Sequence, residues 1–282
     1  MVTRILRFCF SVSFLLGAVL GCSRTDLAFK FADTYIAAKT DEYFSLTSAQ
    51  KKEFTKNLQG DLEQIRQKTF PVLAQKFRDL EKYTFQDKIS EAQLETIFKL
   101  VQEQFHAVGQ QFSDSTLKLV VQLNDSQYEY LEKQVHKNIK SNDEDSQDPR
   151  DLVKETNKKY KKMFVLWLGD LSSDQKKMLE KFIKEKPFPW QLRNKNKEFI
   201  MKNFLEARKK PETLKAFIQA FFTQYDSLQL PAYKTAALKY EADLRVFMVS
   251  LWKTFSPAQR EYLHEALEKR AQDLDRLAKE RP

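Results

Sequence analysis

The chain is poor in glycine and in cysteine. Of its 282 residues, five are glycine and two are cysteine, namely Cys9 and Cys22. A chain with so little glycine offers no glycine-rich phosphate loop, and it contains no Gly-x-Ser-x-Gly nucleophile motif. Because no cysteine follows residue 22, the remainder of the chain holds no thiol and no disulfide, so its stability must come from packing.

Histidine is also scarce. The three histidines, His106, His136 and His264, are far apart in the sequence. A zinc site of the His-Glu-x-x-His type needs two histidines one helical turn apart, and His264-Glu265 lacks the second. We therefore expect no enzyme, no catalytic or metal-binding residues and no cofactor.

A short basic and apolar segment opens the chain. Two arginines within the first seven residues precede an apolar run over residues 8–20. This run is too short for a stable membrane span and is typical of an export signal. It ends in Leu20-Gly21-Cys22, which resembles the lipobox of bacterial lipoproteins. The resemblance implies that residues 1–21 are a signal peptide removed by cleavage between Gly21 and Cys22, and that Cys22 carries lipid.

The lipobox resemblance also implies a location. Lipid on Cys22 would hold the mature chain, residues 22–282, at the bacterial cell envelope, facing the periplasm. Ser23 favours the outer membrane over the inner membrane, because aspartate at that position is the common inner-membrane retention signal of bacterial lipoproteins. The alternative is an ordinary signal peptide in which Cys22 occurs by coincidence.

The chain is basic, with 48 lysines and arginines against 39 acidic residues and a net charge of +9. Removal of Arg4 and Arg7 with the leader reduces this charge to +7. Basic proteins often bind nucleic acid, but an exported lipoprotein meets little of it. We expect no nucleic acid partner; we expect contact with the membrane through the lipid, and with an envelope protein or an anionic surface.

Apolar residues recur at the steps of three and four that are typical of amphipathic helices. The clearest stripe consists of Leu94, Phe98, Val101, Phe105, Val108 and Phe112. Glu, Lys, Leu, Gln and Ala favour helices, and strand-like alternation is hard to find. The sequence predicts an all-α fold, a multi-helix bundle of roughly eight to ten helices.

One short pattern marks helix starts. An apolar residue, then Ser, Thr or Asn, then any two residues and Gln occurs five times. The copies are Thr47–Gln50, Ser90–Gln93, Asn124–Gln127, Ser172–Gln175 and Ser256–Gln259. In such a capping box the small polar side chain accepts a hydrogen bond from the first helical turn, and the glutamine bonds back to the backbone of the cap. We predict a helix start at each copy.

Proline and an acidic stretch mark further boundaries. Pro71 is predicted to end or kink the helix that begins at Thr47, and Pro231 to open a long helix over residues 232–254. Residues 141–150 are polar and acidic and are predicted to form a flexible linker. This linker would divide the chain into an amino-terminal bundle, 22–140, and a carboxy-terminal bundle, 151–282; whether the two bundles pack together stays open.

Several motifs resemble a family of uncharacterised all-helical bacterial lipoproteins. The lipobox is followed by Tyr43-Phe44-Ser45-Leu46, by repeated Leu-Ser/Thr-x-x-Gln steps, and by Trp167-Leu168-Gly169-Asp170-Leu171-Ser172 in the middle of the chain. The resemblance implies an all-helical envelope protein without an established activity. The Leu-Thr-x-x-Gln step also resembles Spy-like and CpxP-like periplasmic chaperones, which implies a helical cradle that holds unfolded clients.

One basic run is a candidate interaction surface. Lys158, Lys159, Lys161 and Lys162 surround Tyr160 and precede an apolar stretch over residues 163–167. Such a segment is compatible with a membrane surface or a polyanion. The alternative is a helix that enters the core behind a solvated start. A second basic cluster over residues 193–210 is interleaved with apolar residues at helical spacing, which favours core packing.

These observations predict a lipid-anchored cell-envelope protein of unknown molecular activity. We expect it to be a non-enzymatic binding or envelope-assembly protein; the alternative is a periplasmic chaperone-like binder of unfolded clients.

Overall fold

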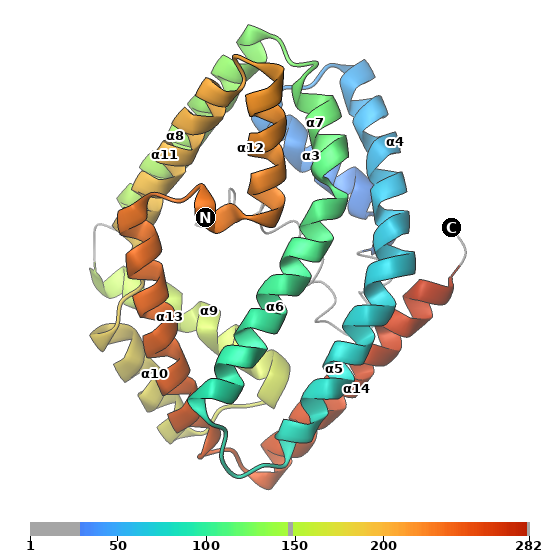
Figure 1. The fold of residues 1–282 in the computed structure, drawn as a ribbon. Helices are drawn as coiled ribbons and strands as arrows, with labels where there is room; N and C mark the ends of the chain where they lie inside the picture. Colours follow the sequence, from blue (N-terminus) through green and yellow to red (C-terminus); the bar gives the residue numbers. More distant parts are fainter. Residues whose placement is uncertain (1–28, 146–148, 281–282) are drawn as a thin grey trace.

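The computed structural model describes residues 29–145 and 149–280. These residues form helices and connecting turns and contain no strand, which confirms the predicted all-α class (Figure 1). They make up eleven helices if α4, η1 and α5 are counted as one continuous helix, against the eight to ten expected. Among the described helices, none has both the length and the apolar character that a membrane span requires.

The helices of the amino-terminal part are α3 (Ala32–Phe44), α4 (Ser48–Gln64), the π-helix η1 (Ile65–Thr69), α5 (Phe70–Thr84), α6 (Glu91–Gln111), α7 (Ser113–Val120) and α8 (Asp125–Asp145). Those that follow are α9 (Pro149–Leu168), α10 (Ser173–Glu185), α11 (Trp190–Ala207), α12 (Pro211–Thr223), the 3-10 turn η2 (Tyr225–Ser227), α13 (Pro231–Trp252) and α14 (Pro257–Lys279).

The long helices outline an elongated molecule (Figure 1). α5 and α14 lie side by side along one edge, and α8 and α11 lie side by side along the opposite edge. In this view α6 lies between these edges and slants in the same direction as they do. Segments that are distant in the sequence are therefore neighbours along both edges.

Two hydrophobic cores hold the helices together. The first core contains residues of α3, α4, α7, α8, α11 and α12, and the second contains residues of α9, α10, α13 and the beginning of α6. α14 contributes to both, with Leu263 and Leu267 in the second core and Ala271, Leu274 and Leu277 in the first. Neither core is confined to one side of residues 146–148.

The predicted linker differs from the observed structure. Of residues 141–150, the first five complete α8 and the last two begin α9, which leaves only 146–148 outside the described residues. The acidic composition of this segment indicated flexibility. In the structure, however, Pro149 starts a helix, because at the first position of α9 its missing N–H costs no hydrogen bond. The division into bundles 22–140 and 151–282 also does not follow the cores, because α11 and α12 pack with the amino-terminal helices.

Pro71 neither ends the helix nor leaves it regular. The chain stays helical from Ser48 to Thr84, and the π-turn η1 lies directly before the proline. In this turn the N–H of Phe70 bonds to the carbonyl of Ile65, one residue farther back than in an α-helix. A proline inside a helix lacks an N–H and crowds the preceding turn, and a π-turn is one way to absorb this defect.

All five predicted capping boxes are present. Four have the reciprocal bonds of a Ser or Thr cap, and at the fifth the N–H of Gln127 donates to Asn124 Oδ1 at 3.0 Å. The Asn124 N–H in turn donates to Gln127 Oε1 at 3.2 Å. The helix starts predicted at these copies are confirmed.

Four of the five glutamines also bond to one another, an arrangement we call the glutamine pairs. Gln50 and Gln127 exchange amide hydrogen bonds of 3.2 and 2.8 Å, and Gln175 and Gln259 exchange bonds of 2.9 and 2.8 Å. The first pair joins the α3–α4 turn to the α7–α8 turn, and the second joins α9–α10 to α13–α14. The pairs lie at opposite ends of the molecule (Figure 1).

All four glutamines of the pairs make the same type of backbone contact. The Nε2 of each also donates to a backbone carbonyl two residues before the partner's cap, as in Gln175 to Thr254 and Gln259 to Asp170. Gln50 to Gln122 and Gln127 to Ser45 repeat this pattern. Each pair is therefore a self-complementary contact, in which both helix corners use the same atoms.

Candidate functional site

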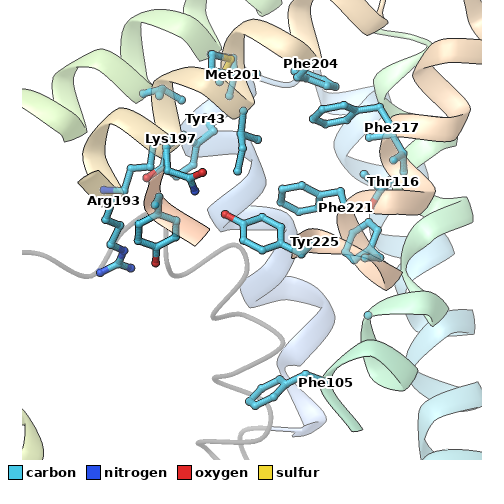
Figure 2. Close-up of a pocket in the computed structure, with 18 of the residues that line it drawn as sticks. Tyr43, Phe105, Thr116, Arg193, Lys197, Met201, Phe204, Phe217, Phe221 and Tyr225 are labelled. Atoms are coloured by element: carbon cyan, nitrogen blue, oxygen red, sulfur yellow. The ribbon is translucent and has the colours of Figure 1, made fainter. Parts of the chain in front are cut away.

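A large cavity lies between the first core and the middle of the molecule. Its volume is about 680 Å³, and its wall is formed by α3, α6, α7, α8, α9, α11, α12, η2 and α13 together with Phe188. Ligand sites in proteins typically measure about 300–1,000 Å³. Figure 2 shows the side chains of α11 and α12 reaching into this space.

Aromatic rings dominate one side of the cavity. Phe204 on α11 lies 5.5 Å from Phe217, and Phe221 lies 6.4 Å from Phe217 and 5.6 Å from Tyr225 (centroid distances). Phe217 and Phe221 are one helical turn apart on α12, so they project from the same face. The result is a row of rings, which Figure 2 shows along α12 and η2.

The middle of α6 forms another part of the wall. The predicted stripe is buried at its ends, at Leu94 and at Val108 and Phe112, but Val101 is 43% exposed and Phe105 is only partly covered. Phe105 and His106 line the cavity. Periodicity correctly predicts a continuous apolar face, but the central part of this face borders open space instead of a filled core.

Basic side chains occupy the other side of the cavity. Arg193 and Lys197 lie one turn apart on α11, and Lys159 comes from α9. The Arg193 guanidinium lies 5.1 Å from the ring centroid of Trp190, and Lys159 Nζ lies 5.6 Å from the same ring. Among the described residues that line the cavity there is no aspartate or glutamate. The electrostatic potential contributed by these lining side chains is therefore positive.

Buried polar groups keep the wall in place. Asn196 is 1% exposed, and its Oδ1 accepts a hydrogen bond of 2.7 Å from the N–H of Leu230, just before α13. Tyr160 of the wall shares a hydroxyl–hydroxyl hydrogen bond with Tyr240 of α13. Burial raises the pKa of Tyr160 and of Tyr233 above the usual value for a phenol. Both hydroxyls therefore stay neutral and can donate hydrogen bonds.

The predicted basic run is divided between two faces of α9. Lys159 faces the cavity, whereas Lys158, Lys161 and Lys162 border a second hollow of about 730 Å³. Spacing explains the division, because Lys159 shares a face with residues 156 and 160, and the others share a face with residues 154 and 165. The interaction surface stays a prediction. Gly21 and Cys22 lie outside the described residues.

The histidines do not come together. His106 lines the cavity, His136 on α8 lies 3.8 Å from Glu132, and the His264 ring lies 5.3 Å from that of Phe85. The part of the chain that the structure describes has no group of three or more metal-binding side chains.

Sequence reasoning missed the role of α11. The cluster over residues 193–210 was predicted to pack in the core, and Ile200 and Phe204 are indeed buried. However, Arg193, Lys197 and Met201 follow one another at steps of four and line the cavity. The sequence signal for this lining was that cationic and apolar side chains share a single face of the helix.

Comparison with known proteins places the chain in a family. A model described as a family of unknown function, DUF6279, matches residues 42–234. The chain belongs to this family. The DUF6279 match extends from α3 into α13 and includes every described lining residue of the cavity except Thr40. Neither the curated proteins nor the solved structures gave a match.

Proposed function

We propose that this DUF6279 protein is a non-enzymatic binding protein of the cell envelope, and that the cavity holds its ligand. The observation that carries the proposal is a cavity of 680 Å³ with an aromatic and aliphatic wall. Such a wall with few polar groups is typical of sites that bind ligands by burying apolar surface. Binding at the envelope also accords with the lipobox-like sequence before Cys22.

Ligand binding is tested with a neutral apolar fluorophore, N-phenyl-1-naphthylamine, and protein purified with Cys22→Ser so that no lipid is attached. We expect saturable binding. Met201→Trp, which fills part of the cavity, is expected to weaken binding about tenfold or more. Leu238→Trp is the control, because Leu238 on α13 is 55% exposed and does not line the cavity. Absence of binding, or equal loss in both variants, would contradict the proposal.

The envelope location has its own test. In cells that process bacterial lipoproteins, the native protein is expected in the membrane fraction with the added mass of its acyl chains. Cys22→Ser is expected to move it to the soluble fraction, because two or more acyl chains anchor a protein stably and no anchor would remain. Unchanged mass and partition would count against the lipid anchor.

A second candidate is a chaperone-like binder of unfolded clients. The observation that favours it is the exposed Val101, one turn from Phe105 on α6, which extends the apolar wall to the surface. The protein would then suppress aggregation of a denatured client at near-equal molar ratio, and Met201→Trp would reduce this effect. No suppression by the native protein would end this candidate.

A further inference from the structure

The aromatic side of the cavity is an elongated surface. Four lining rings, which we call the ring row, follow one another from α11 along α12 to η2 (Figure 2), namely Phe204, Phe217, Phe221 and Tyr225. Successive ring centroids lie 5.5, 6.4 and 5.6 Å apart. A ligand that covers the whole ring row must therefore be longer than it is wide.

The ring row offers little hydrogen bonding. Of its four side chains, three are hydrocarbon rings and Tyr225 alone has a hydroxyl. Further buried residues of the lining are aliphatic, among them Leu119, Val120, Leu131, Val135 and Ile200. A polar group that lay on these surfaces would lose its hydrogen bonds to water without replacing them. The part of a ligand that lies along the ring row must therefore be hydrocarbon.

The orientation of the rings favours a flexible ligand over a rigid one. Successive ring planes are inclined to one another by 44°, 23° and 85°. A flat, rigid ligand can lie against one of these planes but not against all four, whereas a chain that rotates about each carbon–carbon bond can follow them in turn. Since contacts between apolar atoms are individually weak and add up, a chain that reaches every ring gains the most.

We propose that the ligand is a lipid with a long unbranched hydrocarbon chain, and that this chain lies along the ring row. The proposal rests on the proposed binding function, and it adds the chemical class of the ligand. An unfolded protein would instead bring a polar backbone to the ring row, where its amide groups would lack hydrogen-bond partners.

The test compares two neutral alcohols of different shape. Dodecanol and cyclododecanol have the same number of carbons and one hydroxyl each, and both compete with N-phenyl-1-naphthylamine for the Cys22→Ser protein below their solubility limits. We expect the dissociation constant of dodecanol to be about tenfold or more below that of cyclododecanol, because the open chain alone can contact all four rings. Equal dissociation constants, or tighter binding of cyclododecanol, would overturn the proposed chain.

Chain length gives a second measurement. From octanol through decanol to dodecanol, each added methylene is expected to lower the dissociation constant about fourfold, as the burial of one more methylene requires. A dissociation constant that stops falling at octanol would show a short site and would contradict a long chain.

A variant locates the chain. Phe221 lies inside the ring row and is only partly buried, so Phe221→Ala is expected to raise the dissociation constant of dodecanol about tenfold. Phe85→Ala is the matched control, because Phe85 is 57% exposed and does not line the cavity. The same loss in both variants would overturn the placement along the ring row. If Phe221→Ala does not fold, Phe221→Leu and the comparison of alcohols without this substitution still decide.

The possible failures are distinguishable. If dodecanol and cyclododecanol bind equally while Met201→Trp still weakens binding of the probe, the chain is overturned and the apolar binding function stands. If the Cys22→Ser protein binds neither the probe nor any of the alcohols, the proposed binding function itself fails.

Discussion

Gly109 is the residue at which α6 comes close to the end of α12. A Cβ atom at this position would lie 3.1 Å from the carbonyl oxygen of Phe222 and 3.3 Å from its ring. Gly60 on α4 is different, because a Cβ there would meet nothing within 4 Å. The two helical glycines therefore make a matched pair for testing close packing.

We expect Gly60→Ala to raise the free energy of unfolding by about 0.5–1 kcal/mol, because alanine is a better helix former. The free energy of unfolding of Gly109→Ala is expected to be about 1–3 kcal/mol lower than that of Gly60→Ala, because overpacking against Phe222 opposes the gain in helix propensity. Urea denaturation of both variants measures the difference. Equal stabilisation by the two substitutions would show that α12 can move away from the added Cβ atom without a loss of stability.

Asp61 is a partly buried carboxylate between α4 and α7. Burial raises its pKa from 3.8 to about 6, a change opposed by a hydrogen bond from Ser115 and by Lys118 and reinforced by Asp114. Its Oδ2 has no hydrogen-bond partner among the described residues. The ionised form is therefore the unfavourable one in the folded protein.

The folded protein consequently binds this proton more tightly than the unfolded chain. The contribution of Asp61 to stability is fully present below about pH 3.8 and is lost as the pH rises through about 6. Asp61→Asn is expected to gain stability relative to the native protein over this interval and to hold a constant advantage above it. Urea denaturation from pH 4 to pH 8 measures this, with the exposed Asp87→Asn as control. A pH-independent difference would contradict the assignment.

Residue identities predict some of these positions and not others. The capping residues could be read from the sequence, because a cap depends on contacts within four residues. The shared helical face of Arg193 and Lys197 could also be read from the sequence, but its position at a cavity could not, because helical periodicity says which face a residue occupies but not whether that face meets a filled core or a space.

At the scale of elements, the glutamine pairs connect helix corners that are 77 and 84 residues apart. Each corner was predictable as a helix start, but the pairing was not, since nothing local distinguishes Gln93 from the other four. Gln93 forms a complete capping box, yet its Nε2 reaches Gln86 Oε1 at 3.4 Å instead of another capping glutamine.

This difference gives a controlled experiment. Gln175 is 1% exposed. Gln175→Ala would remove the hydrogen bonds that its Nε2 donates to the Thr254 carbonyl and to Gln259 Oε1, and also the cap bond that its Oε1 accepts from the Ser172 N–H. We expect a loss of about 1–3 kcal/mol, against about 0.5–1.5 kcal/mol for Gln93→Ala. A double-mutant cycle of Gln175 and Gln259, both changed to Ala, is expected to give a coupling of about 0.5 kcal/mol or more. Equal losses at Gln93 and Gln175, with no coupling, would show that the pairing adds nothing.

At the scale of the whole molecule, each of the two cores is built from helices of both the amino-terminal and the carboxy-terminal part of the chain. α11 and α12 complete the first core, while the beginning of α6 helps to build the second. α14 runs through both and packs along α5, where Arg78 pairs with Asp275 at 2.7 Å. The all-helical class could be predicted from local patterns alone. The assignment of α11 and α12 to the first core and of the beginning of α6 to the second depends on contacts between distant segments, which no local pattern encodes.

We therefore expect the intact protein to unfold in a single cooperative transition. Separate chains of residues 23–145 and 149–282 are expected to remain largely unfolded, because each would expose the apolar faces that the other covers. Circular dichroism and urea titration of the three proteins test this. A fragment that unfolds cooperatively by itself would instead support independent bundles.

The self-complementary form of the glutamine pairs has a consequence for the symmetry of the fold. A contact in which both partners use the same atoms relates them as the two halves of a two-fold symmetric dimer are related. At each end of the described molecule, a local half-turn therefore exchanges the two paired corners and their hydrogen bonds.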